Sequence, residues 1–156
     1  MATLPKDIKT NYPLPAYNYR VEISGKNYAF SDVSGLNIQF ETTTYKQSPT
    51  ENGKAGPTIL HMPGQRQPAT ISLKRGLINN SDIRALYSWI AQTQVNVIEK
   101  RDIFVRLLDE AGEPVLSWKV LNAFPKQLDA PTFTANSNEV AIESMTLMAD
   151  AVVLES

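Results

Sequence analysis

The sequence predicts a mainly β domain, built as a barrel or a two-sheet sandwich of about seven or eight strands with one α-helix. Short runs in which apolar and polar residues alternate are typical of strands with one buried face. Turn-forming residues separate these runs, and only one segment has the spacing of an amphipathic helix. With 156 residues, 42% of them hydrophobic and 20% charged, the chain has the size and composition of one globular domain.

The first strands follow an N-terminal arm. Residues 1–15 contain Pro5, Pro13 and Pro15, which disfavour regular structure and predict an extended arm before a single domain at 16–154. Alternation then predicts strands at 17–23, 28–30, 36–45, 58–62 and 69–75.

The predicted helix covers about residues 81–93. Ser81 is a suitable N-cap, and the acidic Asp82 suits the positive end of the helix dipole. An apolar stripe at helical spacing follows and should face the core; it consists of Ile83, Leu86, Tyr87 and Ile90.

The C-terminal half predicts a hairpin and a last strand. Runs at 103–107 and 116–122 flank a polar turn, and Pro125 and Pro131 bracket an irregular connection. In the last strand, the apolar parity changes between Ile142 and Met145, which predicts a β-bulge near residues 143–144.

The residues offer little for catalysis, so we expect no enzyme, no cofactor and no metal site. The chain lacks cysteine, which excludes disulfides and thiol chemistry, and His61 is its one histidine. Asp109, Glu110 and Glu113 share one predicted turn but lack the order of an EF-hand loop. Large residues such as Tyr19, Phe40 and Trp118 are expected to fill the interior.

Charge and targeting signals are also uninformative. A formal net charge of −1 gives no electrostatic footprint for nucleic acid or for an anionic membrane. We find no apolar stretch long enough to span a bilayer and no secretory signal in the first residues. The long polar segment 46–57 predicts a mobile loop, and such loops are often functional.

Five motifs, in order along the chain, resemble the inner tube proteins of contractile phage tails and phage-tail-like injection particles. They are FSDVSGL at 30–36, MPG at 62–64 followed by ISLKRG at 71–76, KRDI at 100–103, EPV to AFP across 113–125, and NEVAIE at 138–143. The resemblance extends from about residue 13 to residue 154.

This resemblance implies an Hcp-like β-barrel or sandwich whose copies form hexameric rings that stack into a hollow tube. The implied partners are other copies of the chain, a contractile sheath, a baseplate or spike hub, and a tube cap or terminator. The implied cargo in the lumen is a protein toxin or DNA. It also implies assembly in the bacterial cytoplasm, followed by release in an extracellular particle or virion.

The resemblance also implies which residues contact cargo and neighbours. In the family, two hairpins per subunit line the lumen, and the polar parity of the matching strands selects six lumen candidates: Gln39, Glu41, Thr43, Arg106, Ser117 and Lys119. An extended loop touches a neighbouring subunit or ring, and its candidates here are Lys46, Gln47, Ser48, Pro49, Thr50, Glu51, Asn52, Gly53, Lys54, Ala55 and Gly56.

Other functions remain open at this point. The chain could form a tube-initiator ring that joins the tube to the spike hub, or a secreted Hcp-like tube that acts as chaperone or effector. In a different class, it could be a monomeric ligand-binding β-barrel.

Overall fold

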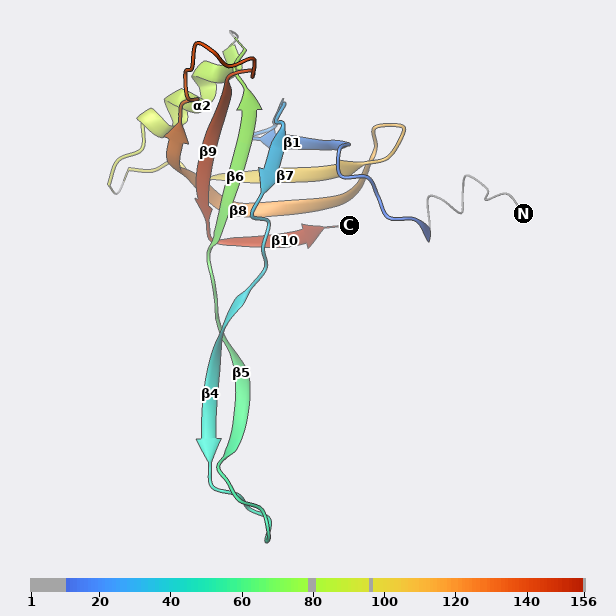
Figure 1. Ribbon diagram of the computed structural model, residues 1–156, viewed down its shortest axis with the longest axis vertical. Coiled ribbons are helices and arrows are strands. Elements are labelled where there is room, and N and C mark those ends of the chain that lie inside the picture. The colour runs from blue at the N-terminus through green and yellow to red at the C-terminus, as the bar shows by residue number, and fades with distance from the viewer. Residues whose placement is uncertain (1–10, 79–80, 96, 156) are drawn as a thin grey trace, which may run out of the picture.

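The computed structural model describes residues 11–78, 81–95 and 97–155, which form a two-sheet body and a long separate hairpin (Figure 1). Most of the predicted arm, residues 1–10, lies outside the described part. The first sheet contains β2 (Lys26–Tyr28), β1 (Tyr19–Ile23), β7 (Arg101–Leu108), the first part of β8 (Pro114–Asp129) and β10 (Ala151–Glu155). The second sheet contains the last part of β8, β9 (Ile142–Ala149), β6 (Ala69–Gly76) and β3 (Asp32–Ser34).

Strand β8 belongs to both sheets because it bends near Asn122. Its first part lies between β7 and β10, whereas Phe124 and the residues after it pair with β9. Asn122 has a φ of 51°, and Asp102 and Asp150 hold its backbone N–H and its side-chain amide. This left-handed conformation, which asparagine tolerates better than most residues, turns the strand from one sheet into the other.

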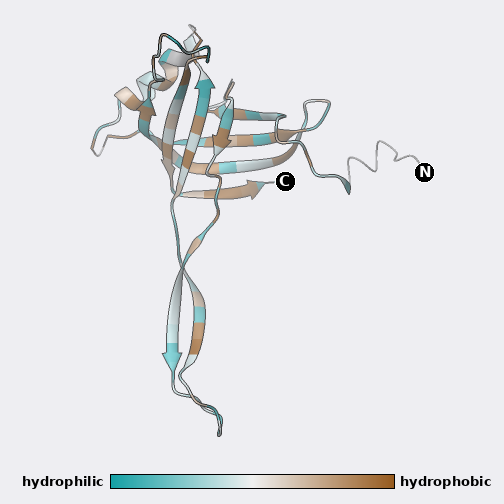
Figure 2. Ribbon diagram, in the orientation of Figure 1, coloured by the Kyte–Doolittle hydropathy of each residue, from teal (hydrophilic) through white to brown (hydrophobic). Residues whose placement is uncertain are grey.

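The core lies between the two sheets. Inward positions alternate along β6, β7 and β9, and the hydropathy of these strands alternates in step (Figure 2). The largest fully buried side chains of this core include Ile23, Ile71, Ile103 and Leu147. A mainly β fold is therefore confirmed, and it is a sandwich whose sheets share one bent strand.

Helix α2 (Ser81–Ala91) packs beside the body, within two residues of its predicted extent. Leu86 is buried as predicted, but Tyr87 is 60% exposed. The side chain that anchors the helix is Trp89, only 2% exposed, whose indole N–H donates to the Glu99 carbonyl at 2.8 Å.

The structure corrects several predicted strand limits. Ten strands are present in the described residues, because β3 and β10 were not predicted as separate strands. β8 continues through Pro125, where a register shift accommodates the missing N–H. The bulge predicted near residues 143–144 is absent, since β6 and β9 pair in one register from Ala69 to Gly76.

The continuous register of β9 sends its first apolar residues outward. Val140, just before the strand, and Ile142 are exposed, while Glu143 takes the inward position. Glu143 is paired there with Arg75 of β6, Nε to Oε2 at 3.1 Å. The apparent change of parity in the sequence therefore reflects a buried ion pair rather than a bulge.

The remaining two strands, β4 (Phe40–Gln47) and β5 (Thr58–Arg66), form a hairpin that projects away from the body (Figure 1). Every residue of both strands is exposed. β5 runs through Pro63 and Gly64, beyond the predicted end of this strand at residue 62. Phe40, expected inside the domain, lies on this hairpin instead.

Candidate functional site

The β4–β5 hairpin has two chemically different faces, set by its register. Directly opposite residues share a face in an antiparallel pair, and Tyr45 lies opposite Leu60 while Thr43 lies opposite Met62. We call this side, with Thr43, Tyr45, Leu60 and Met62, the apolar hairpin face. Glu41 and Gln47 have the same parity along β4 and flank it.

The opposite side is mostly polar. Thr44 lies opposite His61, and the Thr44 hydroxyl is 3.2 Å from His61 Nδ1. Thr42 and Lys46 have the same parity as Thr44, and these four residues define the polar hairpin face. Ile59 and Pro63 lie opposite Lys46 and Thr42 and are apolar side chains on the same side of the hairpin.

The base of the hairpin contains a bulge. The register shifts between Phe40, opposite Arg66, and Thr42, opposite Pro63, so β5 carries one extra residue. Gly64 lies in this bulge, where a Cβ would stand 3.1 Å from the Glu41 carbonyl oxygen. The Arg66 guanidinium stacks on the Phe40 ring, 5.5 Å from its centroid.

The predicted contact loop lies at the far tip of the hairpin (Figure 1). Lys46 and Gln47 belong to β4 rather than to the loop, because they pair with Ile59 and Thr58. The remaining loop candidates, residues 48–56, have little packing, and Lys54 and Glu51 form an exposed ion pair at 2.8 Å. Such exposed pairs add little to stability.

Three of the six lumen candidates lie together on the outer face of the first sheet. Arg106 of β7 is directly opposite Ser117 of β8, and Lys119 is opposite Phe104 two pairs further along, on the same face. Both candidate cations of this face have a carboxylate partner within the sheet. Arg106 forms an ion pair with Glu22 of β1, and Lys119 Nζ is 4.0 Å from Asp102 Oδ2.

Both candidate cations of this face contact one aromatic ring. Phe104 lies between them, with the Arg106 guanidinium 4.7 Å and the Lys119 ammonium 5.5 Å from its centroid. Sequence reasoning missed Arg20 and Glu22, although β1 alternates clearly; the missing information was that β1 pairs with β7, which puts Arg20 opposite Arg106.

The other three candidates are not part of this cluster. Glu41 and Thr43 lie on the projecting hairpin, on the side of Tyr45, Leu60 and Met62. Gln39 precedes β4, and its carbonyl accepts a hydrogen bond from the Gln67 N–H at 3.0 Å. Polarity along β4 alone suggested that these residues share a polar surface, but β5 contributes apolar neighbours to Thr43.

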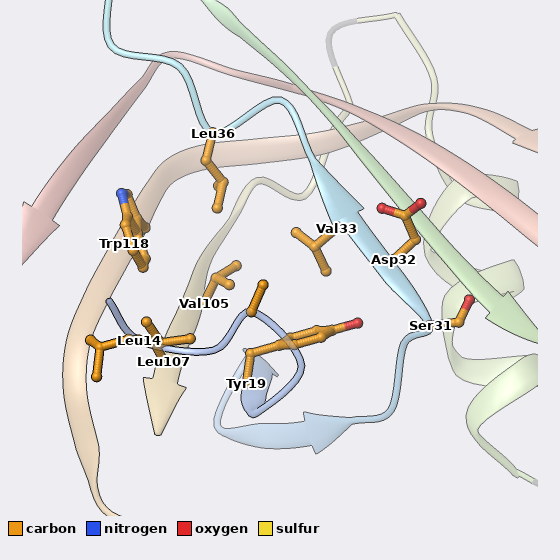
Figure 3. Close-up of a pocket in the computed structure, with 10 residues that line it drawn as sticks. Leu14, Tyr19, Ser31, Asp32, Val33, Leu36, Val105, Leu107 and Trp118 are labelled. Carbon is orange, nitrogen blue, oxygen red and sulfur yellow. The ribbon is translucent and has the colours of Figure 1, made fainter. Parts of the chain in front are cut away.

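The body has an apolar cavity of about 390 Å³ where the two sheets part (Figure 3). Side chains from β1, β3, β7 and β8 point into it, and Leu36 and the arm residue Leu14 close its sides. Its apolar lining includes Val33, Leu107 and Trp118. Leu154, opposite Trp118 on β10, is 54% exposed, so the described part of the chain does not cover this end of the inner surface.

One ionisable side chain is perturbed at this cavity. Partial burial of the phenol, followed by the negative charge of Asp32, raises the pKa of Tyr19 above its ordinary value of 10.0. The Tyr19 hydroxyl donates to the Phe30 carbonyl at 2.6 Å. Tyr19 therefore remains a neutral donor that links β1 to the segment before β3.

Nowhere among the described residues do three or more metal-ligating side chains come together. The helices of the described part are too short or too polar to cross a membrane.

The whole body and hairpin match a known protein family. The model of the T4-like virus tail tube protein gp19 family matches residues 15–153. The chain belongs to this tail tube family. The resemblance that the sequence motifs indicated is thereby confirmed, and members of this family are structural subunits rather than enzymes.

Solved structures agree with this family. A chain from the sheath–tube complex of an extracellular contractile injection system, PVC, in the extended state, has 35% sequence identity and a TM-score of 0.87, with 99% of each chain covered. A chain from the anti-feeding prophage tube-terminating cap has 39% identity and a TM-score of 0.84, covering 100% of this chain and 99% of that one.

The Hcp-like fold is confirmed at greater distance. Hcp1 from Flavobacterium johnsoniae has 14% identity and a TM-score of 0.50, covering 88% of this chain and 94% of that one. At this identity the likeness concerns the fold alone. Among curated proteins, none is similar to this tail tube chain.

Proposed function

We propose that this tail tube protein is the main-shaft subunit of a contractile injection particle, in which hexameric rings stack into a hollow tube inside a sheath. The observation that carries the proposal is the β4–β5 hairpin, every residue of which is exposed in the single chain. An isolated two-stranded hairpin is at best marginally stable in water, so it needs a partner. The high similarity to a chain of a sheath–tube complex supports the shaft over an initiator ring.

The solved structures of a sheath–tube complex, a tube cap and a baseplate support the proposed partners. Other copies of the chain, a contractile sheath, a baseplate or hub, and a tube cap contact the tube, which is assembled in the cytoplasm and released in the particle. A head-to-tail interface closes each ring, and stacking extends the tube. The cargo is a protein toxin or DNA that occupies the lumen.

Within the tube, we place Arg106, Ser117 and Lys119 at the lumen. Their face of the first sheet is polar and is the outer side of the sandwich. Glu22 and Asp102 compensate Arg106 and Lys119, so of the charged residues named on this face only Arg20 adds to the net charge of this part of the wall. Gln39, Glu41 and Thr43 have weaker support, since Thr43 and Glu41 share a side with Tyr45, Leu60 and Met62.

The loop at the hairpin tip is proposed to contact a neighbouring subunit or the next ring. The test replaces residues 48–57 with Asn-Gly, which suits a two-residue turn between Gln47 and Thr58 and keeps the hairpin register. Negative-stain electron microscopy over a concentration series, with baseplate components added, should show rings and tubes for the wild type. The loop variant should remain soluble and form no tubes; tubes of normal length would contradict this role of the loop.

A further inference from the structure

The tip of the β4–β5 hairpin carries Asn52 followed directly by Gly53, the one asparagine–glycine pair in the sequence. They form an exposed turn in the loop 48–57, which lies at the end of the hairpin farthest from the body (Figure 1). Gly53 has a φ of 83°, which glycine adopts without steric cost. Local freedom is greatest at exposed loop tips of this kind, so the two residues can sample many relative orientations.

Two groups at this turn can react with each other, namely the side-chain amide carbon of Asn52 and the backbone nitrogen of Gly53. Neither the Asn52 amide nor the Gly53 N–H makes a hydrogen bond to another described residue. A Cβ at position 53 would meet nothing within 4 Å, so the space beside this nitrogen is open. Lys54 and Glu51 pair with each other at 2.8 Å and hold neither group in place.

Two other exposed asparagines, in the loop before β9, lack these conditions. Asn136 precedes Ser137, whose N–H donates to the Thr134 carbonyl at 3.1 Å. Asn138 precedes Glu139, whose N–H donates to the Ser137 hydroxyl at 3.1 Å. In both cases the neighbouring nitrogen is held by a hydrogen bond and is flanked by a side chain. Exposure is therefore shared by all three asparagines, whereas a free and unhindered neighbouring nitrogen distinguishes Asn52.

We propose that Asn52 is a site of spontaneous deamidation in the unassembled chain. The Gly53 nitrogen attacks Cγ of Asn52, the Cγ–Nδ2 bond breaks, and Nδ2 leaves as ammonia with the proton from the Gly53 nitrogen. Water then opens the resulting succinimide ring. Cleavage at Cγ gives aspartate, whereas cleavage at the main-chain carbonyl of residue 52 gives isoaspartate, in which the chain continues through the side chain. Water is the one co-reactant, and the reaction needs a single chain, so the proposal does not depend on the tube function.

Deamidation changes both the charge and the backbone of the hairpin tip. Residues 48–56 contain one acidic and one basic residue, Glu51 and Lys54, so their formal charge falls from zero to −1. The new carboxylate lies between these two residues in the sequence and competes with Glu51 for the Lys54 ammonium. Isoaspartate also adds a methylene carbon to the main chain within the turn. Modified subunits therefore differ from fresh ones at the tip of the hairpin.

The test incubates the full chain in neutral buffer, at a concentration where electron microscopy shows no rings, beside a synthetic peptide of residues 47–57. Deamidation raises the mass by about 1 Da, because OH replaces NH2, and isoaspartate is detected by enzymatic methylation. Peptide mapping should place the change at Asn52 and find both aspartate and isoaspartate. The chain should convert at no less than about a tenth of the rate of the peptide, which corresponds to a barrier raised by less than about 1.4 kcal/mol.

The matched control is Asn52→Gln, which keeps the amide and the glycine that follows it. Its longer side chain must close a larger ring, so this variant should keep its mass and charge while the wild type converts. Asn136 and Asn138 serve as internal controls and should stay intact. A wild-type rate below about a tenth of that of the peptide would overturn the proposal. Conversion of either internal control at the rate of Asn52, an equal change in Asn52→Gln, or aspartate without isoaspartate would overturn it as well.

Discussion

At the scale of single residues, the most demanding interaction in the body is the buried pair of Arg75 and Glu143. Both side chains are 9% exposed, and they lie opposite each other on β6 and β9. Arg75 Nη2 is buried and has no hydrogen-bond partner among the described residues. A buried pair of this kind costs desolvation that its own attraction only partly offsets.

We predict that Glu143→Val lowers the free energy of unfolding by about 3–5 kcal/mol, because it leaves a buried, uncompensated guanidinium. The double variant Arg75→Leu/Glu143→Val should return to within about 1 kcal/mol of the wild type, since neither charge is left behind. Urea unfolding of unassembled subunits measures both values. Equal losses in the single and double variants would show that the pair itself provides the stability.

A second residue-scale prediction concerns Gly35, which has a φ of 90°. A Cβ at this position would stand 2.1 Å from the Thr70 carbonyl oxygen, so β3 can approach β6 only if the residue is glycine. Gly35→Ala should therefore lower stability by more than the ~1–3 kcal/mol of backbone strain alone.

The matched control for this variant is Gly25→Ala. Gly25 has a similar φ of 80°, but a Cβ there would meet nothing within 4 Å. The difference between the two losses isolates the close approach of β3 to β6. Equal losses in urea unfolding would mean that only the positive φ matters.

At the scale of elements, alternation in the sequence located most strands, and an apolar stripe at helical spacing located the helix. Alternation gave wrong strand limits where a proline or a buried charged residue interrupts the pattern. Pro125 looked like the end of β8 but sits at a register shift inside it. A bulge was predicted near Glu143 because its buried carboxylate occupies a position where an apolar side chain is expected.

The candidate site was harder to predict because it depends on pairing between strands. Arg106, Ser117 and Lys119 were grouped correctly on one face, since a tight hairpin joins β7 to β8 and fixes their register. For β4, polarity along a single strand misrepresented the surface, because Leu60 and Met62 come from a partner that follows a long loop. Trp89 anchors the helix through a hydrogen bond to Glu99. The spacing of apolar residues carries no information about such a bond, so the sequence did not predict this anchor.

The hairpin provides the element-scale prediction. Amides of β4 and β5 in unassembled subunits should exchange with deuterium much faster than those of β6 and β9, because the hairpin contributes no residue to the core. In tubes, the hairpin amides should become protected, whereas β6 and β9 should change little. Protection of the hairpin in dilute subunits would mean that it is stable without neighbours.

At the scale of the whole molecule, the chain divides its stability between two sources. The body has a continuous core of its own, built from both sheets and α2. The hairpin and the cavity instead leave apolar surface exposed among the described residues of the single chain. Folding of the body and assembly of the tube should therefore be separable by mutation.

The last prediction uses this separation. Assembly stabilises the folded chain by mass action, because neighbours bind the folded state and not the unfolded one. The Tm of the wild type should therefore rise with protein concentration in the range where rings form. The variant with Asn-Gly in place of residues 48–57 should have a Tm that does not change with concentration and that equals the dilute limit of the wild type. Scanning calorimetry over a hundredfold range of concentration measures both proteins.

Two outcomes would contradict this prediction. A wild-type Tm that stays constant while electron microscopy shows tubes would mean that the tube does not stabilise its subunits. A lower Tm for the dilute variant than for the dilute wild type would mean that the loop also stabilises the fold of the single chain.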